Sequence, residues 1–112
     1  MLSLKLGLSL NNIKTLGGWN PDDEASLEAW YKNKTGVLLS GSNVTKWDDS
    51  STNTFVMQQG TTAEQPTYDA ATGAVNFDGS DDHLQLASGA ISLTGDFTIG
   101  MKVTVDAGLG VP

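Results

Sequence analysis

The chain contains no cysteine and few cations, and each shortage excludes a class of protein. Without cysteine there is neither a disulfide framework nor a thiolate metal site, so the fold must rest on packing or on subunit contacts. Only six lysines and arginines oppose thirteen acidic residues, which gives a formal net charge of −7. Because phosphate neutralisation needs clustered cations, we expect no nucleic acid and no anionic membrane surface as a partner. No apolar run approaches a transmembrane length.

Catalytic patterns are also missing from the sequence. His83 is the single histidine, and no local motif places it in a Ser-His-Asp arrangement. Retaining glycoside hydrolysis needs two carboxylates that face each other at roughly 5 Å. Glu24 and Glu28 instead fall in a predicted helix and Glu64 in a loop. We therefore expect no enzyme, no catalytic residue and no cofactor.

Turn-forming residues are plentiful. Thirteen glycines stand with only three prolines among many Ser, Thr, Asn and Asp residues, which favours many short strands over a few long helices. At 112 residues and 38% hydrophobic content, the chain can bury one modest core. The composition predicts a mainly β protein of at most one domain.

The first ten residues, MLSLKLGLSL, have the period of a β-strand rather than that of a signal peptide. Alternation places five leucines on one face of this strand. They are Leu2, Leu4, Leu6, Leu8 and Leu10. Such a segment is either a first core strand or an arm that docks on a neighbouring subunit by strand addition. We divide the chain into an N-terminal arm, residues 1–18, and a β-domain, residues 19–112.

One helix is predicted after the arm, from Pro21 to about Lys32. Asn20 is a suitable N-cap, proline fits the first helical position, and Leu27, Trp30 and Tyr31 recur at helical spacing.

The remaining chain predicts strands separated by tight turns. Val37 to Trp47 has the pattern of a hairpin, and Thr67-Tyr68 is a brief extended piece. Ala74 to Leu86 predicts a second hairpin around Asp78 to Asp82. Phe97 to Val105 alternates most clearly and predicts the final strand. The expected core consists of the large apolar members of these segments, namely Trp30, Trp47, Phe77, Phe97 and Ile99.

Five pieces of the sequence, in this order, resemble the front of a known domain type. The pieces are LEAWY (27–31), VTKWDDSS (44–51), QPTY (65–68), FDGSDDHLQL (77–86) and ISLTGDFTIG (91–100). Together they resemble concanavalin A-like lectin/glucanase domains of the LamG type, particularly those in virion structural proteins of tailed phages such as cyanophages. The resemblance runs from about Leu27 to Val105. It implies an antiparallel β-sandwich of jelly-roll type. Members usually run well beyond this length, so we expect an incomplete or shortened sandwich.

Two groups of residues could form binding sites, and each also has a simpler structural role. Asp78, Asp81 and Asp82 could offer the oxygen ligands that Ca²⁺ prefers, although Asp is also the residue that a tight turn selects. We favour the turn. Trp19, Trp47 and Tyr68 could stack on a sugar, although a tryptophan in an alternating strand most often fills the core.

The sequence therefore predicts a non-enzymatic phage virion protein, with a decoration, attachment, tail, fibre or neck role on the particle surface. Its partners would be other virion proteins and copies of itself, contacted through the leucines of the arm. The alternative is a lectin-like module that binds a cell-surface glycan during host adhesion.

Overall fold

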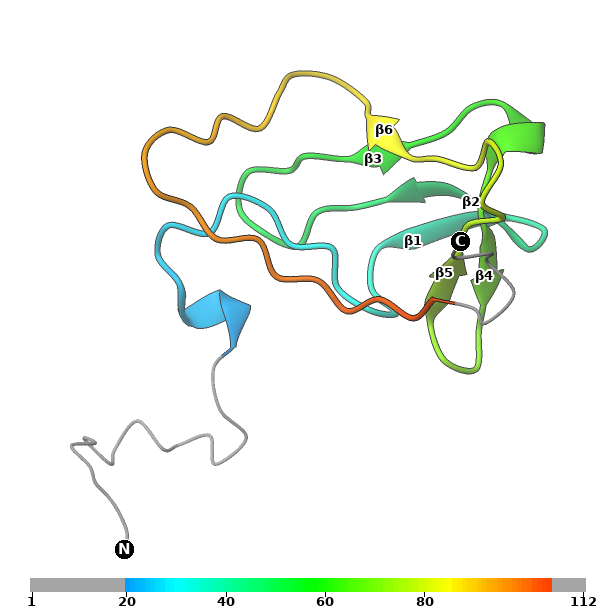
Figure 1. The fold of residues 1–112 in the computed structure, drawn as a ribbon, viewed down its shortest axis with the longest axis horizontal. Coiled ribbons are helices and arrows are strands. Elements are labelled where there is room, and N and C mark those ends of the chain that lie inside the picture. The colour runs from blue at the N-terminus through cyan, green and yellow to red at the C-terminus, as the bar shows by residue number, and fades with distance from the viewer. Residues whose placement is uncertain (1–19, 106–112) are drawn as a thin grey trace, which may run out of the picture.

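The structure is a computed structural model that describes residues 20–105. These residues form six short strands in one antiparallel sheet, so the predicted mainly β, antiparallel class is confirmed (Figure 1). The strands pair in the order β5-β4-β2-β3-β6, and β1 pairs with β2. Their bounds are β1 Val37–Ser40, β2 Asn43–Trp47, β3 Met57–Gln58, β4 Thr67–Asp69, β5 Ala74–Asn76 and β6 Gln85–Leu86. Two short 3₁₀ turns accompany them, η2 Pro21–Asp23 and η3 Thr62–Glu64.

Strand β2 is the centre of the sheet because both of its edges are paired. One edge carries β1. The other edge is shared, since Lys46 and Trp47 pair with β3 while Asn43 pairs with Thr67 of β4. Strand β6 is then attached through β3, and β5 through β4. The sheet therefore has two branches, β3–β6 and β4–β5, which start from opposite ends of β2.

The predicted hairpin between Val37 and Trp47 is confirmed as β1 and β2. Its turn is closed by Gly41 with φ +64°, a left-handed conformation that glycine adopts without steric cost. A bulge at Thr45 shifts the register, and the Thr45 hydroxyl donates to the carbonyl of Leu38 at 3.1 Å. The bulge frees the Thr45 carbonyl to accept the Gln59 N–H on the other edge, at 3.0 Å.

The predicted helix from Pro21 to Lys32 is wrong, because only η2 forms. Asn20 does cap it, since its side chain accepts the Asp22 N–H at 3.3 Å. Glu24 then turns extended, and its carboxylate accepts both the N–H and the hydroxyl of Ser26. The Trp30 N–H, which a helix would use internally, donates to Asp49 instead. A side chain distant in the sequence therefore replaces one of the helical hydrogen bonds.

The second predicted hairpin is also wrong, although part of each predicted strand exists. Strand β5 pairs with β4, and β6 pairs with β3 on the far side of the sheet. Between them, the Asp78 carboxylate accepts the N–H of Ser80 at 2.8 Å and folds the chain into a compact turn. After that turn His83 bonds to Glu64, and Ala87 bonds to Val56. These contacts direct the chain across the sheet rather than back along β5.

The core differs from the predicted one. Among the described residues the buried hydrophobic side chain is Val44, which is 0% exposed, and Pro66 is buried beside it. Gln59 and Gln65 are buried as well. Trp30 and Trp47 are half-buried. The other three predicted core residues are exposed, namely Phe77, Phe97 and Ile99.

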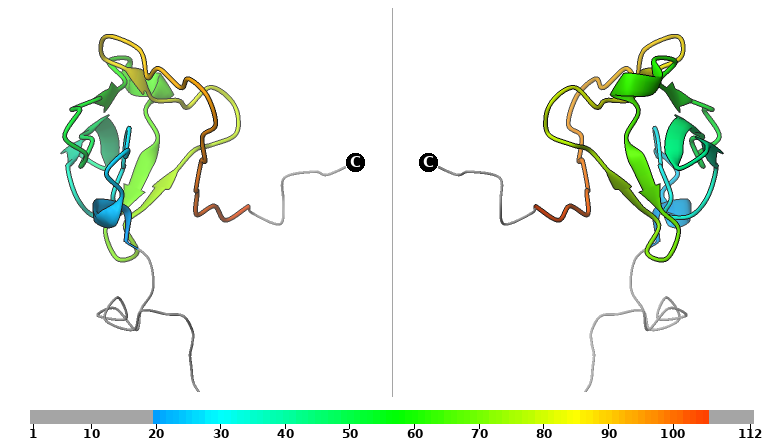
Figure 2. Two further views of the ribbon diagram at one scale, coloured as in Figure 1. Left: turned by 90° about the vertical axis from the view of Figure 1, so that its left-hand side faces the viewer. Right: turned by 90° about the vertical axis from the view of Figure 1, so that its right-hand side faces the viewer.

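Phe97 and Ile99 are exposed because the chain that carries them does not pack on the sheet as a second layer. From Ser88 onwards the chain leaves the sheet and runs along the opposite side of the molecule, as Figure 2 shows. Phe97 to Val105 joins none of the described strand ladders, so the predicted final strand is not formed. Within the described residues there is one sheet, and no second sheet covers its other face.

Gly73 allows the β4–β5 turn to lie against the loop at residues 33–35. The Asn33 amide donates to the carbonyls of Thr72 and Gly73, and Lys34 Nζ donates to Ala71 at 2.8 Å. Gly73 has φ +79°, and a Cβ there would lie 2.6 Å from the Asn33 amide nitrogen. Both the backbone conformation and the space therefore require glycine.

Replacing Val44 with alanine should lower the free energy of unfolding by about 2 kcal/mol, because the side chain is fully buried at the centre of the sheet. Urea denaturation followed by circular dichroism measures this change. Leu38→Ala is the control, since Leu38 is exposed, and we expect a smaller effect. Equal losses in the two variants would contradict the assignment of Val44 as the core.

Candidate functional site

The most unusual surface feature is the row of exposed apolar residues on Phe97–Val105. Five large apolar side chains alternate along this segment and are 58–78% exposed, namely Phe97, Ile99, Met101, Val103 and Val105. The residues between them are Thr98, Gly100, Lys102 and Thr104. The segment is not a strand in the described structure, but pairing it as a β-strand would place all five apolar side chains on one face. Folded proteins rarely leave such a row in water unless it marks an interaction site.

The Asp49 carboxylate holds together the loops before β1 and before β3. Asp49 accepts the backbone N–H groups of Trp30 at 2.7 Å, Ser51 at 2.9 Å and Phe55 at 3.1 Å, and the Ser51 hydroxyl at 2.6 Å. Asn53 adds a further tie by donating to the carbonyl of Glu28 at 2.9 Å. Asp49 therefore closes its own turn through Ser51 and also holds the 27–31 segment in place through Trp30.

These hydrogen bonds control the ionisation of Asp49. Partial burial opposes the charged form, but the bonds from Ser51, Trp30 and Phe55 outweigh it, so the pKa of Asp49 is lowered from its ordinary value. The pKa of the Tyr31 phenol is raised from its ordinary value. Burial is the main cause, and the negative charge of Asp49 adds to it.

Two aromatic rings are used in packing. The Tyr31 hydroxyl donates to the Phe55 carbonyl at 2.6 Å, and its ring meets Trp47 edge-on with centroids 5.9 Å apart. The Trp47 indole N–H donates to the carbonyls of Lys32 and Thr35 at 3.2 and 3.1 Å. Trp47 is therefore an anchor between β2 and the loop before β1.

The other residues weighed for sugar binding are not gathered around Trp47. Tyr68 is half-buried in β4, a strand that joins β2 at the Asn43 end, opposite Trp47. Trp19 lies outside the described residues, as do the five leucines of the predicted arm, Leu2, Leu4, Leu6, Leu8 and Leu10.

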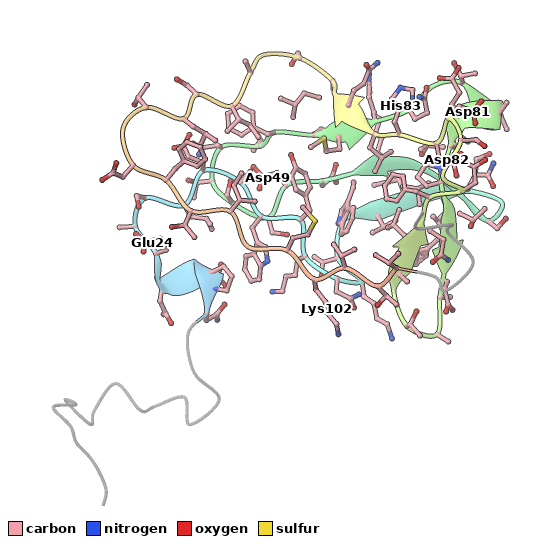
Figure 3. All side chains as sticks on the ribbon, viewed as in Figure 1. Glu24, Asp49, Asp81, Asp82, His83 and Lys102 are labelled. Atoms are coloured by element: carbon pink, nitrogen blue, oxygen red, sulfur yellow. The ribbon has the colours of Figure 1, made fainter. Side chains whose placement is uncertain are left out.

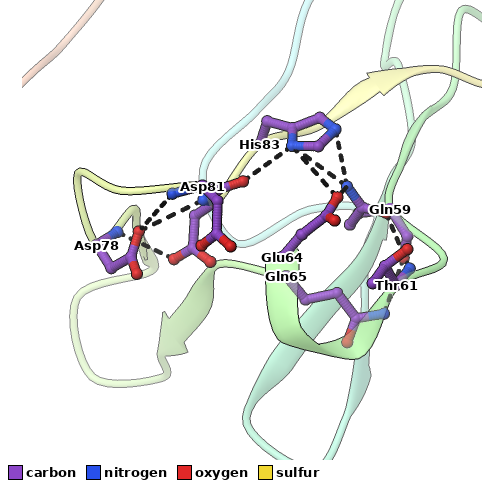
Figure 4. Close-up of polar contacts among 8 residues, drawn as sticks. Gln59, Thr61, Glu64, Gln65, Asp78, Asp81 and His83 are labelled. Carbon is purple, nitrogen blue, oxygen red and sulfur yellow. Dashed lines mark hydrogen bonds and ion pairs between the residues drawn. The ribbon is translucent and has the colours of Figure 1, made fainter.

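A polar cluster joins the η3 loop to the segment before β6 (Figure 4). Gln59 Nε2 donates to the Glu64 carboxylate at 3.2 Å and lies 2.9 Å from His83 Nε2. The Gln65 amide donates to the Gln59 carbonyl at 2.8 Å. His83 Nδ1 lies 3.0 Å from the Asp81 carbonyl. The sequence analysis did not identify the two glutamines, which are buried polar residues without a motif. Their contacts connect loops and give them a structural role.

The three aspartates weighed as calcium ligands come together next to this cluster (Figures 3 and 4). One carboxylate oxygen of each lies within 4.8 Å of the others. The Asp78 carboxylate is occupied by the turn, because it accepts the N–H groups of Ser80, Asp81 and Asp82. The Ser80 bond in particular lowers the pKa of Asp78. Asp78 N–H donates in turn to Asp82 at 3.0 Å. This geometry closes a turn by itself.

Comparison with known proteins found no match to this chain among protein-family models, curated proteins or solved structures. In the part of the chain that the structure describes, no helix has the length and apolar character needed to cross a membrane.

Asp49→Asn should destabilise the fold by about 1–3 kcal/mol at pH 7, because it removes a charged acceptor of several hydrogen bonds. The lowered pKa means that this stabilisation is complete above the unfolded-state pKa, near 3.8, and is lost as the pH falls through the lower folded-state pKa. Urea titrations at pH 7 and at successive steps below pH 4 should show the gap between variant and wild type narrowing. Asp48→Asn is the control, since Asp48 is exposed and contributes none of these bonds. A gap that is constant with pH would contradict the role of the Asp49 charge.

A chelator should leave the melting temperature unchanged, because the Asp78 turn is already closed by its own hydrogen bonds. The measurement is thermal unfolding with EDTA and with added Ca²⁺. Asp81→Asn serves as a second test, since losing one ligand of a real calcium site would abolish any rise in melting temperature on adding Ca²⁺. A drop of several degrees with EDTA that Ca²⁺ restores would show a metal site instead.

Proposed function

We propose that this chain is a non-enzymatic structural subunit that works through contacts with other protein chains. The observation that carries the proposal is the row of exposed apolar side chains on Phe97–Val105, together with the absence of this segment from the described ladders. Exposing five such side chains to water is unfavourable. Fully burying each one at an interface would contribute about 1.5–3 kcal/mol to association. The segment also carries backbone groups available for pairing with another strand.

The finer architecture belongs to the same proposal. The sheet centred on β2 would be one layer of a LamG-like β-sandwich of jelly-roll type, and Phe97–Val105 would belong to the opposite layer. Figure 2 supports this arrangement, because it shows the segment facing the sheet from the other side of the molecule. In this proposal, contacts with neighbouring subunits complete the second layer.

A phage particle surface is the proposed location of this subunit. The support is the resemblance of the pieces from LEAWY to ISLTGDFTIG to LamG-type domains of tailed-phage virion proteins. The charge of −7 fits a component whose polar exterior stays soluble while one apolar face makes the contacts. Its partners are then other virion proteins and copies of itself.

Ile99→Asp should weaken self-association roughly tenfold to hundredfold, because it places a charge in the middle of the apolar row. Analytical ultracentrifugation over a concentration series measures the change. Thr98→Asp is a matched control, because it adds the same charge to an exposed neighbour that would lie on the other face of the strand. A wild-type chain that stays monomeric at every concentration, without other proteins or with them, would refute the assembly role.

A further inference from the structure

We infer that the partner of Phe97–Val105 is the N-terminal segment, Leu2–Leu10, of a neighbouring copy of the same chain. This inference rests on the proposed assembly role and names the contact that would perform it. Each copy would then offer one strand and accept another, so the contact joins two different surfaces rather than one surface to itself.

The two segments match in length and in phase. Each is nine residues long, and each carries five apolar side chains at every second position. When the two are aligned end to end, every leucine lies opposite an apolar residue in the parallel and the antiparallel direction alike. Leu6 lies opposite Met101 in both cases. The polar residues share the other face, so neither face is mixed.

Pairing with Leu2–Leu10 would satisfy both requirements of the Phe97–Val105 segment. A strand beside it supplies partners for backbone N–H and carbonyl groups that no described ladder uses. The leucine face extends the apolar row from five side chains to ten, which gives a two-stranded apolar surface that can lie over the sheet. Strand addition of this kind takes its affinity from main-chain bonds and its register from alternate side chains.

Phe97–Val105 is open to a neighbouring copy of the chain. Its five apolar side chains are 58–78% exposed, so a second molecule can reach them from solvent. Figure 2 shows this segment on the outside of the molecule, opposite the sheet. A copy placed next to the molecule can therefore present its own Leu2–Leu10 to it.

The lack of cysteine in the chain allows a direct test by disulfide cross-linking. Two full-length variants, Leu6→Cys and Met101→Cys, are mixed under mild oxidation, with an affinity tag on one of them. Directly opposed strand residues are close enough to form a disulfide. The control mixture pairs Leu6→Cys with Lys102→Cys, whose side chain would lie on the other face of the strand. We expect roughly tenfold more tagged heterodimer from the Met101 mixture than from the Lys102 mixture.

Several results would overturn the inference. Equal heterodimer yields in the two mixtures would mean that the contact has no defined face. Met101→Cys homodimers that exceed the heterodimer would mean that two copies of Phe97–Val105 pair with each other. A Leu6→Cys, Met101→Cys double variant that closes within one chain would place the arm on its own molecule. In all three cases the proposed assembly role still stands if the wild-type chain self-associates. A wild-type chain that is monomeric with and without other proteins would refute both the assembly role and the Leu2–Leu10 contact.

Discussion

Strand β2 is hydrogen-bonded along both edges, to β1 on one side and to β3 and β4 on the other. The two branches of the sheet, β3–β6 and β4–β5, are joined through β2. The bulge at Thr45 shifts the register of its pairing with β1. Val44 is the buried centre of the arrangement. Ordering the backbone of one residue costs about 1–2 kcal/mol, which a core of this size offsets for only a small number of residues. The rest of the described structure therefore depends on polar anchors and, in the proposed assembly, on contacts that cover the open face of the sheet.

Asp49 is the main polar anchor. It binds backbone groups on both sides of a loop and holds the segment before β1 against the segment before β3. The buried pair Gln59 and Gln65 has a similar role between β3 and β4, where the Gln65 amide donates to the Gln59 carbonyl. Such contacts define positions well but bury little apolar surface. This combination of a well-fixed sheet and exposed apolar residues 97–105 supports the proposal that neighbouring subunits complete the structure.

Sequence patterns predicted local features better than pairing. Glycine and asparagine signals located the β1–β2 hairpin and the Asn20 cap, because turns and caps are set by residues close together in the chain. The predicted helix failed because Asp49, nineteen residues away, takes the Trp30 N–H. The predicted hairpin of β5 and β6 failed for a similar reason, since each strand finds its partner across the sheet. Period-two alternation predicted a strand at Phe97–Val105 that the described residues do not form, because alternation specifies a face and not a partner.

Amide hydrogen exchange at residues 98–104 tests most directly whether Phe97–Val105 is a contact surface. Exchange is followed by mass spectrometry on the intact chain as its concentration rises from the monomeric to the associated range, with peptides from β1 and β2 as an internal reference. If Phe97–Val105 is the contact surface, residues 98–104 exchange fast in the monomer and become strongly protected on association, while β2 is protected throughout. Protection of residues 98–104 that is already complete in the monomer, or fast exchange at every concentration, would contradict it.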